Sequence, residues 1–290
     1  MTVRQSTRRP GPPEGEKRAL KTLIVIPARI GSTRFPAKPL HVIAGHSLVS
    51  RVADIAARVS AMRADTDYVI ATDDQAIMDH AAAIGAPALL TDPALPSGTD
   101  RALAAARAHG SGPDFILNLQ GDAPFTPPGY LSALIDAAET GTADVVTPVV
   151  QLDWEALDTI REQKKREPFS GTSCIRRADG MALWFSKQII PAIRKEDALR
   201  KQGPLSPVWR HIGLYGFRMD ALERFASLPI GHYEALEGLE QLRFLENGMT
   251  IQAVAVEPGT NAMWGVDTPE DATFAEKLIA EHGDPMDAPR

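Results

Sequence analysis

A short loop near the start of the chain carries several cationic and hydroxyl side chains directly after an apolar run. The apolar run is Leu23–Ile26, and the loop that follows contains Arg29, Ser32, Arg34 and Lys38. Cations neutralise the anionic oxygens of a polyphosphate, and loop amides and hydroxyls donate hydrogen bonds to them. The segment is neither a GxxxxGKS/T phosphate loop nor a GxGxxG dinucleotide loop. It therefore predicts another kind of polyphosphate site, with a solvated basic turn as the alternative.

Two carboxylates are the next candidates for chemistry. Asp122 follows the apolar segment Phe115–Leu119 and Gly121, a residue that allows close backbone approach. Asp267 lies in the segment GVDTPED. Together they could hold Mg²⁺ against phosphate oxygens. The alternative for each is a cap or a turn, since Asp267 or Thr268 also fits the start of a helix.

Further polar residues follow other apolar segments. Asp73 and Asp74 end the segment YVIATDD, and capping of a helix from Gln75 would explain at least one of them. The hydroxyl-rich turn Ser97–Arg101 enters a helix, and the amides of a helix start can meet an anion or a base carbonyl. Gln120 directly precedes Gly121 and Asp122. In open parallel sheets, ligands bind beyond the carboxyl ends of the strands, so these residues are expected to form one site.

The first half of the chain alternates between short apolar segments and Ala-rich segments with helical periodicity. The expected strands are Leu23–Ile26, Tyr68–Ala71, Phe115–Leu119 and Asp144–Val149, and the expected helices are Leu48–Met62, Gln75–Ile84, Arg101–His109 and Tyr130–Glu139. Strand–helix–strand units at this spacing predict an α/β fold with a mainly parallel sheet covered by helices. Gly85 stands where the second helix should end.

The second half has a different pattern. Residues 150–210 are polar and irregular, include the charged run Arg161–Glu167, and are interpreted as an insertion or a dimer arm within a single domain spanning 22–290. The expected elements are strands at Met181–Phe185, His211–Arg218 and Ile251–Val256 and helices at Ala235–Asn247 and Thr268–Glu281.

Composition limits the classes of protein that the chain can be. Its net charge is −6, yet residues 1–21 carry six Lys/Arg and two Glu, so the remainder is acidic at −10. An acidic body argues against nucleic-acid binding, and the basic tail is expected to be disordered. The sequence has no run of apolar residues long enough for a membrane span and no signal peptide, and its single cysteine is Cys174. We therefore expect a cytoplasmic protein without a membrane association.

The segments resemble, in order, those of the 3-deoxy-manno-octulosonate cytidylyltransferase family. The similar stretches are IPARIGSTRFPAKPL, ATDD, SGTDR, NLQGD, RHIGLYGFR, LEQLRFLENG and GVDTPED, which span residues 23–272. The resemblance implies a Rossmann-like nucleotidyltransferase sheet, usually in a homodimer. It also implies Mg²⁺-dependent transfer of CMP from CTP to an acidic sugar with release of pyrophosphate, a step that activates the sugar for lipopolysaccharide or capsule synthesis.

The resemblance also assigns roles to residues of this chain. For catalysis it implies Asp122, Asp267, Arg29 and Lys38, with Asp122 and Asp267 as the metal ligands. For CTP it implies Arg29, Ser32, Arg34, Lys38, Asp73, Ser97, Gly98, Thr99 and Gln120. For the sugar acid it implies Lys187, His211, Tyr215, Glu240 and Gln241. A lone His before a strand, such as His211, is more often structural, and Glu240 and Gln241 alone would be read as the polar face of a helix.

The chain also departs from the family's pattern. The family's GDEP contains Ala123 here, its PGKP contains Ala37, and its YFSR ends in Lys187, which offers a carboxylate a point charge in place of an arginine fork. Pro168–Ile175 replaces a stretch similar to NPxxVKVV, and the segment Pro258–Trp264 has extra residues. Most changes fall on the sugar side, so the acceptor could be 3-deoxy-manno-octulosonate (Kdo), 8-amino-Kdo or another 2-keto sugar acid. A non-catalytic CTP-binding protein is the second alternative.

Overall fold

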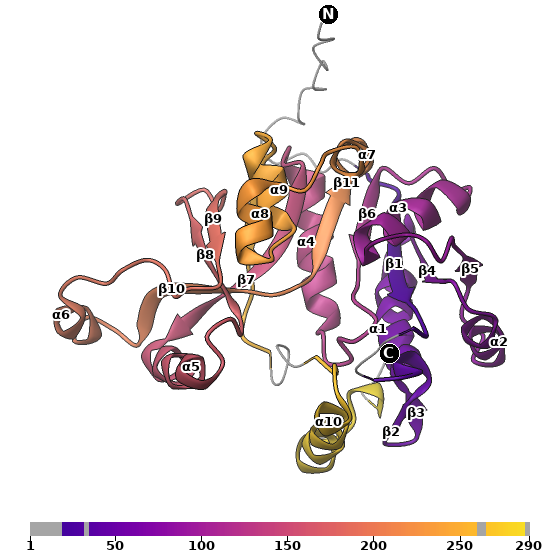
Figure 1. Ribbon diagram of the computed structural model, residues 1–290, viewed down its shortest axis with the longest axis horizontal. Coiled ribbons are helices and arrows are strands. Elements are labelled where there is room, and N and C mark those ends of the chain that lie inside the picture. Colours follow the sequence, from indigo (N-terminus) through magenta and orange to yellow (C-terminus); the bar gives the residue numbers. More distant parts are fainter. Residues whose placement is uncertain (1–18, 32–34, 260–264, 288–290) are drawn as a thin grey trace, which may run out of the picture.

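The computed structural model describes residues 19–31, 35–259 and 265–287 as an α/β fold around one large sheet (Figure 1). The strand order is β5-β4-β1-β6-β11-β7-β10-β8-β9, with β12 paired to β7. The strands are β1 (Thr22–Ala28), β4 (Thr66–Thr72), β5 (Ala88–Leu90), β6 (Phe115–Asn118), β7 (Val145–Asp153), β8 (Thr172–Arg176), β9 (Ala182–Ser186), β10 (Leu205–His211), β11 (Tyr215–Arg218) and β12 (Ile251–Ala255). A separate hairpin consists of β2 (Val42–Ile43) and β3 (His46–Ser47).

Helices connect these strands. They are α1 (Leu48–Met62), α2 (Gln75–Ala83), α3 (Gly98–Ala108), α4 (Pro128–Thr140), α5 (Trp154–Arg166), α6 (Glu196–Arg200), α7 (Met219–Ala226), α8 (His232–Glu237), α9 (Gln241–Glu246) and α10 (Pro269–His282), with short 3-10 turns η1 (Lys38–Leu40) and η2 (Pro285–Asp287). The four helices expected before residue 150 are all present, and α1 has the expected bounds. Gly85, just beyond α2, has a φ of 71°, as a helix-ending glycine requires.

The part of the sheet built by the first half of the chain is parallel. β5, β4, β1 and β6 pair in parallel, and so do β7 and β12. β11 lies between β6 and β7 and is antiparallel to both, so β6 and β7 run in the same direction. The predicted mainly parallel central sheet is confirmed, and antiparallel pairs add β10, β8 and β9 to it. The carboxyl ends of β1, β4 and β6 therefore meet at one edge.

The two faces of the sheet bury separate apolar cores. Ile24 and Ile26 of β1 pack with residues of α1 and α4, whereas Leu23 and Val25 pack with residues of α3, α7 and α9. Successive side chains of a strand point to opposite faces, and all four are fully buried. A strand covered on both faces must be apolar throughout, which explains the uninterrupted apolar run that marked β1 in the sequence.

Residues 150–210, hereafter the arm, extend the sheet away from its parallel half and lie at the left of Figure 1. The arm contains the end of β7 and the elements α5, β8, β9, α6 and β10. The expectation of an irregular segment was wrong, since the charged run Arg161–Glu167 forms the last turns of α5 and its C-cap. Trp154 and Leu157 are the buried residues of that helix and pack with Leu152 and Val208, which gives the arm its own small core.

Two expected elements are interrupted. The strand expected at His211–Arg218 breaks between β10 and β11, where Ile212–Leu214 connect two strands that both run antiparallel to β7. The helix expected at Ala235–Asn247 is two helices, because Gly238 has a φ of 63° and ends α8. Both breaks fall next to residues predicted for the sugar site.

The last helix is tied to the first. The Arg51 guanidinium on α1, which is 2% exposed, donates hydrogen bonds of 2.8 and 3.0 Å to the Asp284 carboxylate beyond α10. Arg51 also donates to the carbonyl of Ile43 in the hairpin. Within the described ranges, every helix is too short or too polar to traverse a lipid bilayer.

Candidate active site

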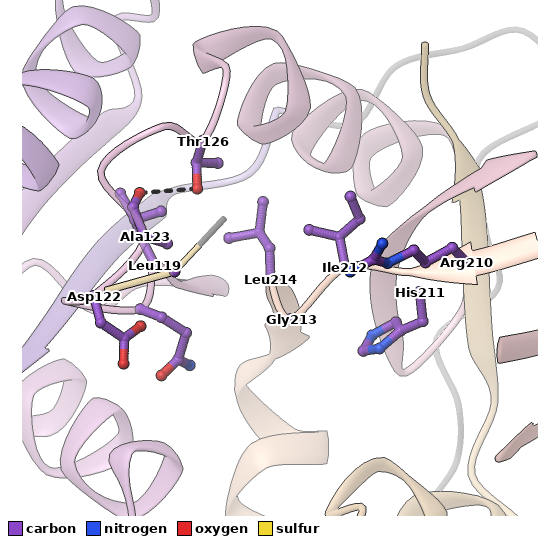
Figure 2. Close-up of a pocket in the computed structure, with 11 residues that line it drawn as sticks. Leu119, Asp122, Ala123, Thr126, Arg210, His211, Ile212, Gly213 and Leu214 are labelled. Atoms are coloured by element: carbon purple, nitrogen blue, oxygen red, sulfur yellow. Dashed lines mark hydrogen bonds between the residues drawn. The ribbon is translucent and has the colours of Figure 1, made fainter. Parts of the chain in front are cut away.

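Two adjoining pockets lie at the carboxyl edge of the parallel strands. The first has a volume of about 290 Å³ and is lined by Pro27, Ala28, Arg29, Lys38, Pro39, Leu95, Ser97, Gly98, Arg101, Gln120, Gly121, Asp122 and Asp267. The second has a volume of about 220 Å³ and is lined by Leu119, Gln120, Asp122, Ala123, Thr126, Arg210, His211, Ile212, Gly213, Leu214 and Gly265. Gln120 and Asp122 belong to both. Figure 2 shows Asp122 and Ala123 on one side of the second pocket and Arg210 and His211 on the other, with Gly213 between them.

Lys38 links the two candidate metal carboxylates. Its ammonium donates a hydrogen bond of 3.0 Å to Asp122 Oδ2 and another of 3.1 Å to Asp267 Oδ1. Burial works to lower the pKa of Lys38, but the charges and hydrogen bonds of both carboxylates outweigh it and raise the pKa above its ordinary value. The ammonium is therefore protonated at neutral pH. Residues from the start, middle and end of the sequence thus meet at one point.

The loop before Lys38 holds an unfavourable backbone conformation. Ala37 has a φ of 53°, in the left-handed region that an L-residue occupies at a cost of about 1–2 kcal/mol. The resemblance places glycine at this position, and glycine would adopt this φ without that cost. The Ala37 amide donates to the Ile30 carbonyl at 3.4 Å, and the turn directs Lys38 to the carboxylates. Ser32 and Arg34 of this loop lie outside the described residues.

The Asp267 side chain is not used as a helix cap. Thr268 is the N-cap of α10, and its hydroxyl accepts from the Asp271 amide, while the Asp271 carboxylate accepts from the Thr268 amide. This reciprocal cap leaves the Asp267 carboxylate to contact Lys38. One residue earlier, the Val266 amide donates to the Asp122 carbonyl at 2.8 Å, which fixes the two carboxylate-bearing segments side by side.

Tyr130 on α4 holds the chain that leads toward Asp267. Its hydroxyl donates to the Glu257 carbonyl at 2.6 Å and accepts from the Gly259 amide at 2.9 Å. Burial raises the pKa of this phenol, so it stays protonated and able to donate. The segment that carries Asp267 is thereby held both before residue 260 and at Val266.

Gly121 has a structural requirement for the absence of a side chain. A Cβ at this position would lie 2.5 Å from the Pro27 carbonyl oxygen at the end of β1. The sequence-based interpretation of close backbone approach is thus confirmed by the geometry. The contact brings the chain before Asp122 against the start of the cationic loop.

The two adjacent aspartates after β4 have different roles. Asp74 caps α2, since its Oδ1 accepts from the Ala76 amide at 2.8 Å. Asp73 forms an ion pair with Arg101, whose Nη2 donates to Asp73 Oδ2 at 2.7 Å. Arg101 lines the first pocket and is 3% exposed, so Asp73 reaches that pocket through Arg101. The sequence analysis did not select Arg101, although it ends the SGTDR segment.

The SGTDR turn begins α3 as expected. Ser97 is the N-cap, and its hydroxyl accepts from the Asp100 amide at 3.1 Å. Gly98 lies beside Pro27 and Gln120 in the first pocket. Thr99 instead donates a hydrogen bond of 2.7 Å to the carboxylate of Glu240. A residue predicted for CTP and one predicted for the sugar acid are therefore in contact.

Among the residues predicted for the sugar acid, His211 and Gln241 are buried, and Tyr215 is half-buried. His211 Nε2 and Thr147 Oγ1 are 2.8 Å apart, and the Tyr215 hydroxyl donates to Gln241 Oε1 at 3.0 Å. Burial, and then the charge of Lys187, lower the pKa of His211 to about 3, so the ring is neutral. Of these residues only His211 is among those that line the second pocket. Tyr215, Glu240 and Gln241 lie behind it in the fold.

Lys187 is anchored through its backbone. Its amide donates to Glu237 Oε2 at 2.7 Å, and its carbonyl accepts from the Lys164 ammonium at 2.6 Å. Burial lowers the pKa of the Lys187 ammonium, and Glu237 partly offsets this effect. Arg210, which the sequence analysis did not select, lines the second pocket where Lys187 does not. Its position directly before His211 was the available signal.

Comparisons with known proteins identify the family of the chain. A family model described as cytidylyltransferase matches residues 23–251. A 3-deoxy-manno-octulosonate cytidylyltransferase from Maricaulis maris is 43% identical over 91% of this chain and 99% of its own length. One from Elusimicrobium minutum is 38% identical over 89% of this chain and 98% of its own length.

Solved structures show the same relationship. The chain matches CMP:2-keto-3-deoxy-manno-octonic acid synthetase complexed with CTP with a TM-score of 0.77 and 30% identity, over 90% of this chain and 99% of that one. It also matches 4-diphosphocytidyl-2C-methyl-D-erythritol synthase from Anaerococcus prevotii with a TM-score of 0.55 and 12% identity, over 89% and 98%, which shows a shared fold alone. The chain is an enzyme of the nucleotidyltransferase class. It belongs to the 3-deoxy-manno-octulosonate cytidylyltransferase family.

Proposed function

We propose that the enzyme transfers CMP from CTP to the anomeric hydroxyl of Kdo and releases pyrophosphate, with Mg²⁺ as its metal. The observation that carries this proposal is the pair of adjoining pockets that share Gln120 and Asp122. The first pocket is lined by cations suited to a triphosphate, and the second reaches His211 on the sugar side. The relatives' names and the CTP complex of a similar synthetase support the choice of nucleotide and acceptor.

The residues present fit a divalent cation. The described part of the chain contains no cluster of three or more His, Cys, Asp or Glu that could hold a metal. Two carboxylates nevertheless converge on one cation, the Lys38 ammonium. Mg²⁺ prefers oxygen ligands and commonly takes one or two carboxylates together with substrate phosphates. Asp122 and Asp267 would hold it, and the bound ion would polarise the α-phosphate and assist ionisation of the attacking hydroxyl.

The chain's own residues account for the remaining requirements of the reaction. Arg29 and Lys38 line the first pocket and carry the positive charge that stabilises a departing pyrophosphate. His211 is neutral and buried, so it serves as a hydrogen-bonding group for the acceptor and not as a cation. The amide nitrogen of Gln241 is buried without a partner among the described residues, which suits a site that binds sugar hydroxyls. In-line attack by the anomeric oxygen on the α-phosphorus then breaks the bond to pyrophosphate.

The primary test is pyrophosphate release from CTP and Mg²⁺ with Kdo, beside 8-amino-Kdo and N-acetylneuraminate. We expect turnover with Kdo. Asp122→Asn and Asp267→Asn should each lower kcat by roughly three orders of magnitude while CTP still binds in calorimetry, whereas the exposed control Glu162→Gln should be unchanged. Near-normal turnover in either aspartate variant would refute the metal assignment. Pyrophosphate release with only one of the other two acids would show that this acid is the acceptor, and would indicate that the change to Lys187 accompanies a changed acceptor pocket.

Other parts of the proposal follow from the family. The arm would form the homodimer contact, the product would serve lipopolysaccharide or capsule synthesis, and the enzyme would act in the cytoplasm. The oligomeric state can be measured directly by light scattering of the purified chain.

A further inference from the structure

Arg210 occupies a distinctive place in the second pocket. It lies on β10, where the arm meets the central sheet, and lines that pocket together with His211, Gln120 and Asp122. Figure 2 shows it across the pocket from Asp122. The residue is half-buried, so its guanidinium has lost part of its hydration. A cation in such a place requires compensation from a carboxylate or from hydrogen bonds.

Several other arginines that are withdrawn from solvent have a partner that Arg210 lacks, and Arg176 stacks over the Trp209 ring. Arg51, Arg101 and Arg243 are each paired with a carboxylate. Across residues 19–31, 35–259 and 265–287, no hydrogen bond or ion pair of the Arg210 guanidinium is found. Burial lowers the pKa of Arg210, and no carboxylate of the described residues offsets this effect. The guanidinium is thus available to bind an anionic ligand.

The surroundings of Arg210 are themselves cationic. Burial, followed by the charges of Lys187 and Arg210, lowers the pKa of Lys164. The Lys164 ammonium is already bonded to the carbonyls of Ser170 and Lys187. The nearby carboxylate of Glu237 accepts from the Ser186 hydroxyl and the Lys187 amide. Glu237 therefore offsets the charges of Lys164 and Lys187 but not that of Arg210. An entering anion would relieve the mutual repulsion of the three cations.

We propose that Arg210 is a specificity-determining residue that binds the carboxylate of the acceptor sugar acid through its guanidinium fork. This inference rests on the proposed function and names the group that recognises the acid. A guanidinium matches the two oxygens of a carboxylate, whereas the ammonium of Lys187 offers a point charge and does not line the second pocket. Arg210 thus supplies the fork that the sequence lacks at Lys187.

A purely structural role for Arg210 predicts different behaviour. The Arg210 guanidinium lies against Gly171, where a Cβ would come within 3.9 Å of Nε and Nη2. If Arg210 only supported this turn of the arm, its loss would lower stability and would affect every acceptor equally. Binding of the carboxylate instead predicts a loss that depends on the charge of the acceptor.

The test is a double-change cycle, in which the Arg210 side chain and the carboxylate of the substrate are altered separately and together. The values of kcat/KM for Kdo and for its carboxamide are measured in wild type, Arg210→Met and Arg210→Lys by pyrophosphate release at saturating CTP. We expect Arg210→Met to lower kcat/KM for Kdo by about 30- to 100-fold and for the carboxamide by less than about threefold. Arg210→Lys should fall between wild type and Arg210→Met with Kdo. The exposed arm arginine in Arg177→Met is the matched control and should change neither value.

Several results would overturn the inference. Equal losses with both acceptors would assign Arg210 a structural role, especially if the thermal midpoint and CTP affinity fell together. Full activity of Arg210→Met with Kdo would likewise refute it. If wild type releases pyrophosphate with Kdo but Arg210→Met loses the same factor with Kdo and with the carboxamide, only this inference is refuted. If wild type is inactive with Kdo, the proposed function is refuted as well.

Discussion

Replacement of Gly121 by alanine tests whether the close contact between β1 and the Asp122 segment sets the geometry of the site. The new Cβ would lie 2.5 Å from the Pro27 carbonyl oxygen, and contacts under 3.0 Å require a shift. The backbone at one of the two segments must therefore move by at least about 0.5 Å. One segment leads to Asp122 and the other to Arg29, so either movement changes the spacing between phosphate-binding and carboxylate groups. Because a misplacement of about 1 Å can cost roughly 100-fold in rate, we expect kcat to fall about ten- to 100-fold.

The predicted loss of activity exceeds the predicted loss of stability. Overpacking costs about 1–3 kcal/mol, which lowers the thermal midpoint of a domain of this size by several degrees. The assay is pyrophosphate release at a temperature well below the midpoint of Gly121→Ala. Gly129→Ala on α4 is the control, since its Cβ would meet nothing within 4 Å. A kcat for Gly121→Ala within twofold of wild type would refute the reasoning.

Two further predictions concern groups that act behind the pockets. Tyr130→Phe should raise the Mg²⁺ concentration needed for the half-maximal rate several-fold, with little change in CTP affinity. The reason is that the segment that leads to Asp267 loses both of its hydrogen bonds to the Tyr130 hydroxyl. An unchanged Mg²⁺ titration would contradict this prediction. Burial lowers the pKa of His211 in the folded chain to about 3, from an ordinary value of 6.5. Between these two pH values the ring is protonated in the unfolded chain but not in the folded one, so the free energy of unfolding falls as pH drops below about 6.5. In urea titrations His211→Gln should flatten this dependence, by up to about 1.4 kcal/mol per pH unit, and an unchanged slope would exclude the buried neutral ring as its cause.

The parallel half of the fold could be predicted from the sequence because its signals are local. Apolar runs such as Leu23–Ile26 are buried on both faces of a sheet, and the periodic segment Leu48–Met62 became α1 without change. The convergence of polar residues at strand ends also followed from the parallel topology. That reasoning placed Lys38 and Asp122 in one site, and Asp267 was added to them as the second metal ligand from the segment GVDTPED. The structure brings the charged groups of all three residues together.

The remainder depends on contacts that no local pattern reveals. The charged run Arg161–Glu167 ends a helix because Trp154 and Leu157, earlier in α5, pack against Leu152 of β7 and Val208 of β10. A single positive φ at Gly238 divides a segment whose periodicity predicts one helix. The Arg210 guanidinium has no hydrogen-bond or ion-pair partner among the described residues. This can be recognised only from the structure, because it depends on which residues surround the guanidinium.

The ion pair between Lys38 and Asp267 joins residues 229 positions apart. A polypeptide emerges from the ribosome from its amino end, so the parallel strands and the first pocket's cations are all synthesised before Asp267 exists. The helix that follows Asp267 and the contact of Asp284 with Arg51 come later still. On the proposed role of Asp267, the nascent chain becomes capable of turnover only after nearly all of its sheet has been synthesised. A polypeptide that ended before Asp267 would carry the cationic loop without its second carboxylate.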